Sequence, residues 1–457
     1  MKQSFEQFKA AIKGKRVAVV GVGVSNTPLI KFLLKLEAKV TAFDRRSIDE
    51  LTDNIRDFAG EVEFSTGADY LSRLQGFDYI FRTPGMRPDM PELIQAKAAG
   101  AIITSEMREF IRYCPGKTIG ITGSDGKSTT TTMTYNLIKA AGLPVHLGGN
   151  IGFPLFDQVE AIKPEDYVVL ELSSFQLMDM DVSTDIAVVT NLSPNHLDVH
   201  KDMAEYIEAK KAIFRYQDES GVLILNQDNP ITEGFAREAN GTVKFFSSRQ
   251  TAAAHYEAGW IHLRGERLVR LADMKLRGVH NAENLCAALL ATEGLVSHDV
   301  IREFASDFPG VHHRCEFVRD FQGVRYYNDS IASSPTRTMA SVKAFEDYKG
   351  RINIILGGYD KNLDYAILAD EGAPYFRNVI LVGATKFKIQ DVFLKSDNPS
   401  RPKLHIAKTF EEAVQTARQT ALPGDLVMMS PASASFDMFK NFEYRGEKFK
   451  DLVEAFE

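Results

Sequence analysis

Cysteine is scarce in this sequence, because only Cys114, Cys286 and Cys315 occur among its 457 residues. Three scattered thiols cannot form a disulfide framework or a cysteine-rich metal cluster, and they are typical of a protein from a reducing cytoplasm. No stretch approaches the ~20 continuous apolar residues that a membrane span requires. Residues 1–16 mix charged and apolar side chains, so we expect neither a signal peptide nor a membrane anchor there.

An excess of positive charge is also missing. The formal net charge is −7, whereas nucleic acids and anionic membranes attract proteins with a concentrated positive surface. We therefore expect no nucleic acid partner and no membrane insertion. What is present is the composition of a globular protein, with 44% hydrophobic and 25% charged residues. The length exceeds that of one compact core of ~100–200 residues, which predicts two to four domains.

Short apolar runs with strand propensity alternate with helix-compatible stretches along the chain. This alternation predicts an α/β protein whose parallel sheets are covered by helices. Proline and glycine interrupt it at residues 114–116 and 307–310, which predicts two boundaries. We expect a Rossmann-like N-terminal domain at 1–113, a central P-loop ATPase-like domain at 114–309 and a Rossmann-like C-terminal domain at 310–457.

The stretch GITGSDGKSTT at residues 120–130 predicts a loop that binds nucleotide phosphates. Gly123 and Gly126 allow backbone N–H groups to point at an anion. Lys127 can then reach the terminal phosphates, and the Ser128 hydroxyl can bind Mg²⁺. The residue five positions before Gly126 is not glycine, so the common P-loop pattern is matched imperfectly, and an exposed turn is the alternative. The predicted ATP-binding loop consists of Gly123, Ser124, Asp125, Gly126, Lys127, Ser128 and Thr129.

Polar residues follow two further predicted strands. Glu171 comes directly after the apolar run 167–170, and His196 lies in the loop after the run 186–189. The carboxyl ends of parallel strands meet at one sheet edge, so we expect both residues near the phosphate loop. Its expected position beside Lys127 favours Glu171 as a ligand of Mg²⁺. A helix cap or a surface charge is the alternative. A single histidine in such a loop is more often a hydrogen-bonding residue than a ligand.

The N-terminal part contains a glycine turn typical of nucleotide-binding folds. Gly21 and Gly23 follow a predicted strand, and Asp44 comes where a dinucleotide fold has its ribose-binding acid, about twenty residues later. Asn26 replaces the third glycine of that pattern. This argues against a nicotinamide or flavin cofactor, although an oxidoreductase stays open as a rival class. Arg45 and Arg46 directly follow the acid and could face a phosphate or solvent.

Two amide side chains begin an alanine- and leucine-rich helical stretch. Asn281 and Asn284 could meet a purine edge or could cap this helix. The neighbouring pair His312 and His313 lacks the spacing and the companion ligands of a zinc site, so we expect no metal at that pair.

The chain carries ten motifs whose order resembles that of the ATP-dependent Mur ligases of peptidoglycan synthesis. The resemblance extends from about residue 15 to the end of the sequence. The GVGVSN opening and the closing segment are most similar to the members that add D-glutamate to UDP-N-acetylmuramoyl-L-alanine. Other Mur ligases and folylpolyglutamate synthetase-like enzymes are the nearest rivals, and the closing segment argues against them. The motifs are GSDGKSTT, GGNIG, ELSSFQL, NHLDVH, EAKKAIF, HNAENL, HHR, NDS, GGYDK and SPASASFDMFKNFEYRG.

The resemblance implies a cytoplasmic enzyme of peptidoglycan precursor synthesis, and hence of cell-wall biogenesis, cell shape and cell division. ATP would convert the alanyl carboxylate into an acyl phosphate, which the amine of D-glutamate would attack. The implied catalytic residues are Lys127, His196 and Lys210. Two Mg²⁺ ions are implied, one at Ser128 and Glu171 and the other at His196 and a carbamylated Lys210. A carbamate offers the hard anionic oxygen that an ammonium lacks, although a plain surface lysine is the alternative.

The resemblance also implies three binding sets. Beyond the phosphate loop, ATP would contact Asn281, Asn284, Arg314 and Asp329. The UDP-substrate would contact Val24, Ser25, Asp44, Arg45, Gly85, Asn150, Ser173, Gln176 and His196. D-Glutamate would contact Ser333, Arg337, Lys361, Ser435 and Phe442.

One departure concerns the amino-acid site. The family pattern after Asn-Asp-Ser continues Lys-Ala-Thr, whereas this sequence has Ile331, Ala332 and Ser333. We expect Arg337 to make the lost carboxylate contact, because a guanidinium pairs bidentately with a carboxylate. A solvent-exposed arginine at a helix start is the alternative. The preference for D- over L-glutamate stays open.

A nucleotide-binding interaction protein without catalysis is a third class of function. The intact set Lys127, Glu171, His196 and Lys210 argues against it. We expect a monomer whose joints near Pro115 and Pro309 allow closure around ATP, because water must be kept away from an acyl phosphate.

Overall fold

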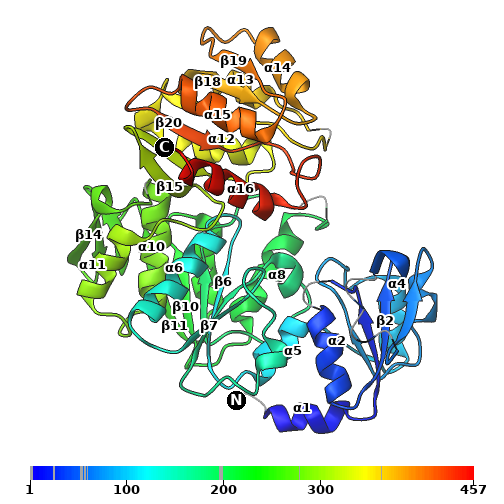
Figure 1. Cartoon of the computed structure of the whole chain (residues 1–457). Helices are drawn as coiled ribbons and strands as arrows, with labels where there is room; N and C mark the ends of the chain where they lie inside the picture. Colours follow the sequence, from blue (N-terminus) through cyan, green and yellow to red (C-terminus); the bar gives the residue numbers. More distant parts are fainter. Residues whose placement is uncertain are drawn as a thin grey trace. The chain divides into compact units, whose positions relative to one another are not determined.

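The computed structural model describes residues 4–23, 26–51, 55, 58, 60–194, 199–276, 278–361 and 363–457. The chain divides into two compact units, Met1–Arg270 with Val279–Phe304 and Leu271–Gly278 with Ala305–Glu457. The first unit holds two sheets and the second unit holds one, each accompanied by helices (Figure 1). The predicted α/β class with three sheet-bearing parts is confirmed.

The N-terminal sheet has the strand order β3-β2-β1-β4-β5, and its described strand pairs are all parallel. This doubly wound order places a topological switch point between β1 and β4, where open α/β sheets bind ligands. Its strands are β1 (Arg16–Val20), β2 (Lys39–Asp44), β3 (Glu63–Thr66), β4 (Tyr79–Phe81) and β5 (Ile102–Thr104). Its helices are α1 (Phe5–Ile12), α2 (Asn26–Lys35), α4 (Pro91–Ala98) and α5 (Glu106–Tyr113).

The central sheet has the order β14-β13-β12-β11-β10-β9-β6-β8-β7. Strands from β7 to β12 pair in parallel, and β13 and β14 extend the β12 edge in antiparallel fashion. Its strands are β6 (Lys117–Thr122), β7 (Val145–Gly149), β8 (Tyr167–Glu171), β9 (Ile186–Val189), β10 (Val222–Asn226), β11 (Thr242–Ser247), β12 (Ala254–Glu257), β13 (Trp260–Leu263) and β14 (Glu266–Arg270). Its helices are α6 (Lys127–Ala140), α7 (Ser174–Leu177), α8 (Met203–Arg215), α9 (Pro230–Gly234), α10 (Val279–Ala291) and α11 (His298–Asp307).

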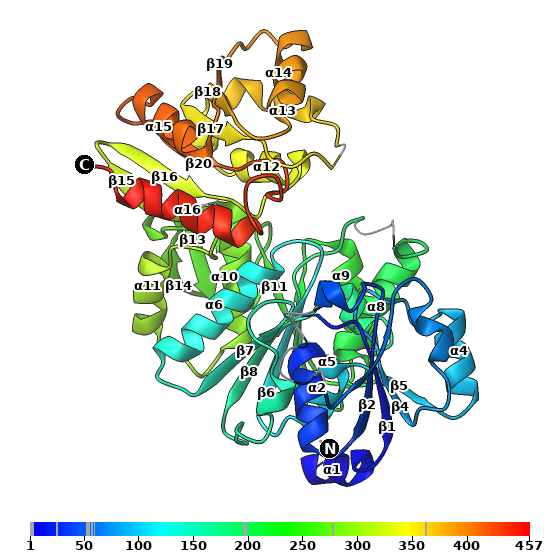
Figure 2. The same ribbon diagram turned by 45° about the vertical axis from the view of Figure 1, so that its right-hand side comes forward.

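The sheet of the second unit has the order β15-β16-β20-β17-β18-β19, with β15 antiparallel and the other strands parallel. Figure 2 shows α12 and α16 beside this sheet from a second direction. Its strands are β15 (Glu316–Phe321), β16 (Val324–Asn328), β17 (Ile352–Leu356), β18 (Phe376–Leu381), β19 (Lys403–Ile406) and β20 (Leu426–Met429). Its helices are α12 (Pro335–Lys343), α13 (Ala366–Asp370), α14 (Lys386–Lys395), α15 (Phe410–Thr420) and α16 (Phe442–Glu454).

The central strands are buried nearly end to end. Every residue of β9, β17 and β20 is buried, as is every residue of β8 after Tyr167. Strands of parallel sheets that are covered on both faces read as continuous apolar runs. This burial explains why these strands could be located from the sequence.

One aromatic cluster joins the first two sheets. The ring of Phe156 lies 5.1 Å from that of Phe8 and 5.6 Å from that of Phe32, in both cases edge to face. Phe8 and Phe156 are fully buried. The N-terminal and central sheets therefore share one hydrophobic core, which spans the predicted boundary at residue 113. The domain boundaries themselves stay a prediction.

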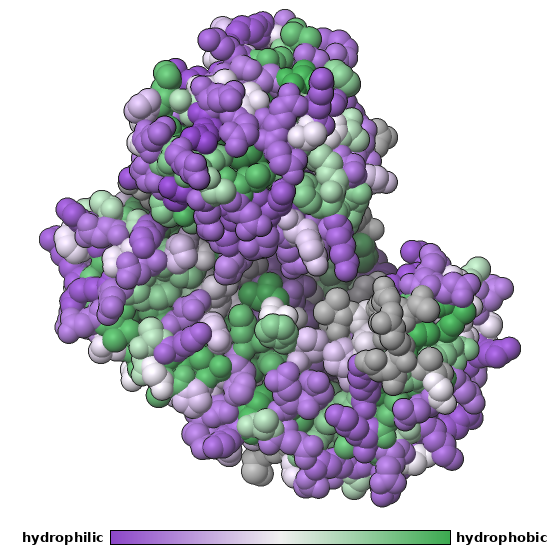
Figure 3. Space-filling view, viewed as in Figure 1, coloured by the Kyte–Doolittle hydropathy of each residue, from purple (hydrophilic) through white to green (hydrophobic). Residues whose placement is uncertain are grey.

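The surface is mainly polar on the face that Figure 3 presents, where hydrophobic side chains form smaller areas between hydrophilic ones. Among the described residues, no helix combines the length and the apolar character that crossing a membrane requires.

Candidate functional site

The phosphate loop joins β6 to α6 as the sequence predicted. Gly126 caps α6 with a left-handed backbone, φ +78°, and Gly123 has φ +150°. A Cβ atom on Gly126 would collide with Asn284 Oδ1, and one on Gly123 would collide with Thr190 Oγ1. Both positions therefore require glycine. At the start of α6 the backbone N–H groups point along the helix axis toward the loop and form the positive end of the helix dipole, which is a suitable site for a phosphate.

Residues 190–193, which follow β9, brace this loop. The Ser124 hydroxyl donates to the Ser193 carbonyl at 2.9 Å, and the Asp125 N–H donates to Asn191 Oδ1 at 2.9 Å. The Thr190 hydroxyl donates to the Asp125 carbonyl at 2.6 Å. The loop is thus held in an anion-binding shape before any ligand binds. Sequence reasoning considered this segment only for the histidine beyond it.

Lys127 begins α6 and folds over the loop. Its ammonium donates to the carbonyls of Gly123 at 2.9 Å and Ser124 at 2.8 Å. Ser128, the next residue, is buried at the start of the same helix. The predicted cation and hydroxyl therefore lie at the loop, as ATP and Mg²⁺ binding would require.

Glu171 ends β8 beside the loop, opposite Ile121 of β6 in the strand register. The carboxylate is 1% exposed. Its Oε1 accepts from Asn150 Nδ2 at 2.8 Å, whereas its Oε2 is buried and has no hydrogen-bond partner within the described ranges. A buried carboxylate oxygen without a partner is costly in an apolar setting, and it is a suitable ligand for a hard cation. These residues fit an Mg²⁺ ion.

Lys210 lies on α8 with its side chain fully buried. Its amine donates to Thr122 Oγ1 at 2.9 Å and lies 4.9 Å from the centre of the Tyr206 ring. Burial and the charge of Lys127 together hold the pKa of this amine well below its usual range, and Glu171 acts in the opposite sense. A neutral amine is nucleophilic, as carbamylation requires.

The neighbouring Lys211 has a different environment. It forms ion pairs with Glu208 at 2.9 Å and Glu238 at 2.7 Å. Lys210 is buried, so the alternative of a plain surface lysine is wrong for it. Lys211 pairs with carboxylates at the surface instead.

The two asparagines of α10 lie along the first turns of α6. Asn284 Oδ1 accepts from the Thr130 hydroxyl at 3.3 Å, and Asn284 Nδ2 donates to Asn281 Oδ1 at 3.1 Å. Both asparagines are buried. Their amides are thus fixed next to the phosphate loop, where a nucleotide would extend.

Asp44 ends β2 at the ligand edge of the first sheet. Its carboxylate accepts from the N–H of Val22 at 2.8 Å and from Nε of Arg46 at 3.0 Å. Burial acts to raise the pKa of Asp44, but these hydrogen bonds and the Arg46 charge outweigh it and lower the pKa. Arg45 is exposed, as is Gly85. Arg46, not Arg45, is therefore the partner of this acid, and sequence reasoning had left its role open.

Ser173 and Gln176 form a capping box at α7. The Ser173 hydroxyl donates to Gln176 Oε1 at 3.0 Å, and the Gln176 N–H donates back to Ser173 Oγ at 3.3 Å. Each side chain thus orients the other at the turn that follows Glu171. Val24, Ser25 and His196 lie outside the described residues.

Arg82 is a residue that sequence reasoning missed. It follows β4 and its side chain is fully buried, with Nε donating to Asp179 at 2.8 Å and Nη1 donating to the Met86 carbonyl at 2.8 Å. Nη2 donates to the Phe175 carbonyl at 3.3 Å. One guanidinium therefore ties the Gly85 loop to the turn that carries Ser173 and Gln176. Only its position directly before the TPGM loop could have indicated this role.

The second unit gathers its own polar group at the carboxyl ends of β16 and β20. Asp329 is buried, accepting from the Ser430 hydroxyl at 2.6 Å and from the Cys315 N–H at 3.1 Å. Burial raises the pKa of this carboxyl. The opposing contributions from hydrogen bonds and from the Arg314 charge are smaller.

A fully buried arginine that sequence reasoning missed, Arg445, holds two of the predicted loops together. Its guanidinium donates to the Ser330 carbonyl at 2.8 Å and to the carbonyls of Ser433 and Ala434, each at 3.1 Å. The Ser330 hydroxyl in turn donates to the Phe442 carbonyl at 2.7 Å. Arg445 thereby positions the loop that contains the predicted glutamate ligand Ser435.

The other residues that are predicted to bind D-glutamate belong to the same unit. Lys361 Nζ lies 5.8 Å from the ring centre of Phe436, which is next to Ser435. Ser333 is half-buried before α12, and Arg337 is exposed in the first turn of that helix. The exposure of Arg337 is compatible with both a carboxylate ligand and a surface arginine.

Three family models match consecutive parts of the chain. The Mur ligase MurD-like N-terminal domain matches residues 15–105, the Mur ligase middle domain residues 121–292, and the Mur ligase glutamate ligase domain residues 313–433.

Curated relatives match along the whole length. A UDP-N-acetylmuramoylalanine–D-glutamate ligase of Clostridium beijerinckii is 52% identical over 460 residues, covering 100% of both chains. The enzyme of the same name from Clostridium perfringens is 50% identical over 458 residues, covering 99% of both chains.

Solved structures agree in fold. MurF from Acinetobacter baumannii gives a TM-score of 0.61 at 18% identity, covering 100% of this chain and 99% of that one. UDP-N-acetylmuramate–alanine ligase MurC from Thermotoga maritima gives 0.60 at 16% identity, covering 96% and 99%. From the matched domains, the full-length relatives and the shared fold, the chain belongs to the Mur ligase family.

Proposed function

We propose that this protein is an ATP-dependent ligase that joins D-glutamate to UDP-N-acetylmuramoyl-L-alanine in peptidoglycan precursor synthesis. The observation that carries this conclusion is the 52% identity over the full chain to a ligase named for that reaction. The geometry agrees, since the phosphate loop, Glu171 and Lys210 converge at one edge of the central sheet. An oxidoreductase is disfavoured, because the full-length relatives are named as ligases and Asn26 stands where the dinucleotide pattern has its third glycine.

The reaction activates a carboxylate and then forms an amide. The γ-phosphoryl group of ATP passes to the alanyl carboxylate, giving an acyl phosphate and ADP. The amine of D-glutamate attacks the acyl carbon, inorganic phosphate leaves, and the nitrogen loses a proton. Phosphoryl transfer between anions depends on positioning and on neutralising charge. In this chain the Lys127 ammonium, which lies at the loop, and the first N–H groups of α6 would stabilise phosphate charge.

We further infer two Mg²⁺ ions, one at Ser128 and Glu171 and one at His196 and a carbamylated Lys210. When bound, these ions would neutralise charge on the phosphates. Oε2 of Glu171, which has no hydrogen-bond partner in the described part of the chain, supports the first site. For the second, the buried amine of Lys210 would attack CO₂, forming a C–N bond and releasing a proton. A ¹³C NMR carbamate signal from protein in ¹³C-bicarbonate, absent from Lys210→Arg, would test this modification.

The remaining substrate contacts are proposed by residue. Asn281, Asn284, Arg314 and Asp329 would serve ATP, with the amides already fixed beside α6. We propose a monomer that acts in the cytoplasm, where ATP is available, and light scattering of the purified protein would test the oligomeric state. The UDP-substrate set is Val24, Ser25, Asp44, Arg45, Gly85, Asn150, Ser173, Gln176 and His196. The D-glutamate set is Ser333, Arg337, Lys361, Ser435 and Phe442.

The deciding experiment measures phosphate release with ATP, Mg²⁺ and UDP-N-acetylmuramoyl-L-alanine. D-Glutamate, L-glutamate, meso-diaminopimelate and L-lysine are offered in turn, and Lys127→Ala serves as the inactive control. We expect release with D-glutamate alone. Release with another amino acid would retain the ligase mechanism but change the specificity, and no release with any of the four would refute the proposed reaction.

A further inference from the structure

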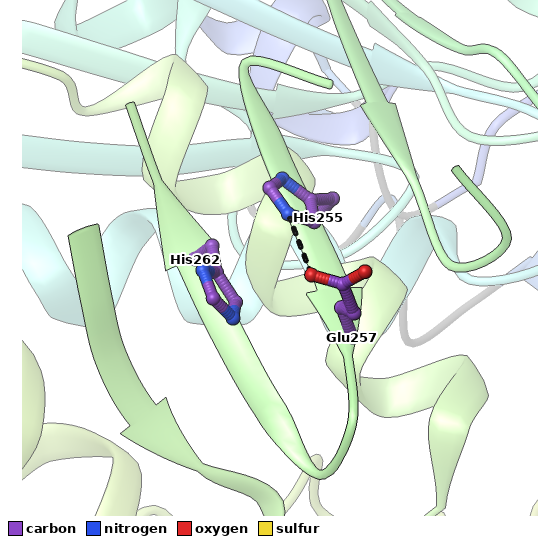
Figure 4. A group of neighbouring side chains, drawn as sticks. All are labelled: His255, Glu257 and His262. Atoms are coloured by element: carbon purple, nitrogen blue, oxygen red, sulfur yellow. Dashed lines mark ion pairs between the residues drawn. The ribbon is translucent and has the colours of Figure 1, made fainter. Parts of the chain in front are cut away.

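Three side chains that the ligase reaction does not use gather on one face of the β12–β13 hairpin (Figure 4). His255 on β12 lies directly opposite His262 on β13 in the antiparallel register. Glu257 follows His255 by two residues, and residues two apart on a strand share a face. The two imidazoles and the carboxylate are therefore neighbours on one rigid hairpin.

The hydrogen bond of His255 determines which nitrogen faces this group. His255 Nδ1 lies 3.0 Å from the Ala252 carbonyl. A carbonyl can only accept, so Nδ1 carries the proton and Nε2 of the neutral ring is left with a bare lone pair. That nitrogen lies 4.0 Å from Glu257 Oε2, which is also an acceptor. Two acceptors at this distance share no hydrogen bond, whereas a cation between them would bind both.

The contact with Ala252 is itself typical of a metal ligand. A histidine that binds a metal usually donates its other ring N–H to a carbonyl or carboxylate, which fixes the tautomer and the ring direction. His255 already has this outer partner. Its ligating nitrogen is therefore oriented before any ion arrives.

The distances are close to those of a zinc site. One donor atom from each of the three residues lies within 4.8 Å of the others, and the imidazole centres are 4.7 Å apart with an interplanar angle of 17°. Zinc bonds nitrogen and oxygen at about 2.0–2.2 Å, so tetrahedral ligands lie about 3.4 Å apart. The ligand atoms must therefore approach one another by up to about 1.4 Å. Rotation of the His262 ring about χ2 and of the Glu257 carboxylate about its terminal torsion, both soft, provides this approach without moving the strands or the His255 ring.

Exposure and charge set further conditions. The side chain of His255 is 4% exposed and that of Glu257 is 66% exposed, so one side of the group is open to an incoming ion and to a water ligand. Arg267 faces His262 from β14. Its positive charge opposes a cation and should make the site weaker than a structural zinc site of four protein ligands.

We propose that His255, Glu257 and His262 form a zinc-binding site that links β12 to β13. Imidazole is a ligand for zinc and its transition-metal neighbours, whereas Mg²⁺ prefers oxygen ligands. The Mg²⁺ of the ligase reaction should therefore not compete for it. The site would be structural, since it lies on the hairpin and not at the phosphate loop.

The test uses the full-length protein, stripped of metal with a chelator and kept in excess Mg²⁺. Titration with Co²⁺ near pH 7.5 should give the visible absorption of a tetrahedral ion at one equivalent, and Zn²⁺ should displace it and raise the melting temperature. His262→Gln should abolish both responses. His298→Gln should keep both responses, because it removes a histidine that lies 3.5 Å from a single carboxylate, Glu266.

The melting temperature of His262→Gln in chelator must match that of the original protein, which shows that the variant is folded. Unchanged zinc binding by this variant would overturn the proposal. So would the absence of both the Co²⁺ spectrum and the zinc-induced shift in the original protein. Glu257→Gln could lower the melting temperature in chelator while zinc leaves the melting temperature of the original protein unchanged. In that case the group is a His255–Glu257 ion pair and the proposal fails.

Discussion

The amine of Lys210 lies 2.9 Å from the hydroxyl oxygen of Thr122, at the end of β6. Thr122 donates its own hydroxyl proton to the Leu172 carbonyl at 2.7 Å, so its oxygen accepts from Lys210. Both side chains are buried. One hydroxyl thus connects the strand before the phosphate loop, the segment after Glu171 and helix α8.

Thr122→Val should misplace the Lys210 amine, because it removes the hydroxyl while keeping the shape of the side chain. Leaving a buried polar group without its partner costs about 1–3 kcal/mol. We expect the free energy of unfolding to fall by about that amount, and kcat for phosphate release to fall at least ~5-fold. Thr122→Ser keeps the hydroxyl and is the control. Equal kcat values for the Val and Ser variants would contradict a positioning role.

Asp179→Asn should destabilise the protein, because it leaves the buried guanidinium of Arg82 without its charge partner. Removing one member of a buried ion pair costs about 3–5 kcal/mol, and Asp179 is 18% exposed, so we expect the lower end of that range in urea unfolding. KM for the UDP-substrate should rise more than KM for ATP. Glu371→Gln, in the exposed pair with Lys343, should change stability by no more than about 0.5 kcal/mol. Similar losses in both variants would refute this assignment.

Glu106 should make stability depend on pH. Its Oε1 accepts from the Phe156 N–H at 3.3 Å, and burial raises the pKa of the carboxyl from 4.5 to about 7. The folded state thus holds the proton more tightly than the unfolded state. Stability is full below pH 4.5 and falls as pH rises through about 7, by roughly 3 kcal/mol in total.

Glu106→Gln keeps the carbonyl acceptor and removes the titration. Its unfolding free energy should therefore fall less between pH 5.5 and pH 8 than that of the original protein. Urea unfolding at the two pH values measures the difference. Parallel pH dependence of the two proteins would show that Glu106 does not titrate in this window.

Gly126→Ala should abolish tight ATP binding. The residue needs φ +78°, and a Cβ would collide with Asn284 Oδ1. Gly142 at the other end of α6 has a similar φ of +73° but open space around its Cβ position. Gly142→Ala should therefore cost only the backbone strain of about 1–2 kcal/mol, with KM for ATP unchanged. Calorimetric titration measures the ATP affinity of both variants. An equal loss of affinity in the two would contradict the steric explanation.

Arg337→Ala should raise KM for D-glutamate far more than KM for ATP if this residue replaces the family lysine at position 331. The loss of a charge-assisted, bidentate contact is the physical reason. Lys343→Ala, at the last turn of the same helix, is the control and should leave both constants unchanged. Equal increases in both constants for Arg337→Ala would mean that the arginine does not contact the amino acid.

The strands and the phosphate loop could be predicted because local chemistry specifies them. Runs such as residues 167–170 are apolar since both faces of a parallel strand are buried. Gly123 and Gly126 stand where the backbone tolerates no Cβ atom. The order of the motifs along the chain likewise indicates the family without reference to the fold.

The partners of individual side chains could not be predicted in the same way. Asp44 is paired with Arg46 and not with Arg45, the next residue in the chain. The direction of the chain after β2 determines which of the two guanidinium groups points back to the carboxylate. Ser173 and Gln176, expected along the substrate, bond each other at a helix cap. The contacts of Arg82 and Arg445 could not be predicted, since they are made with loops that are distant in sequence.

The sequence by itself therefore determined the α/β class and the position of the phosphate loop, because glycine and strand burial act over a few consecutive residues. It also determined the family, because the family's motifs recur in order along the chain. Tertiary structure alone decided that Lys210 is buried against Thr122 while Lys211 meets Glu208 and Glu238 at the surface. Adjacent residues on a helix point about 100° apart. Which of them faces the core is set by the packing of α8 on the central sheet. Burial lowers the pKa of the Lys210 amine, whereas at Lys211 burial is outweighed by the hydrogen bonds to Glu238 and Glu208, which raise the pKa.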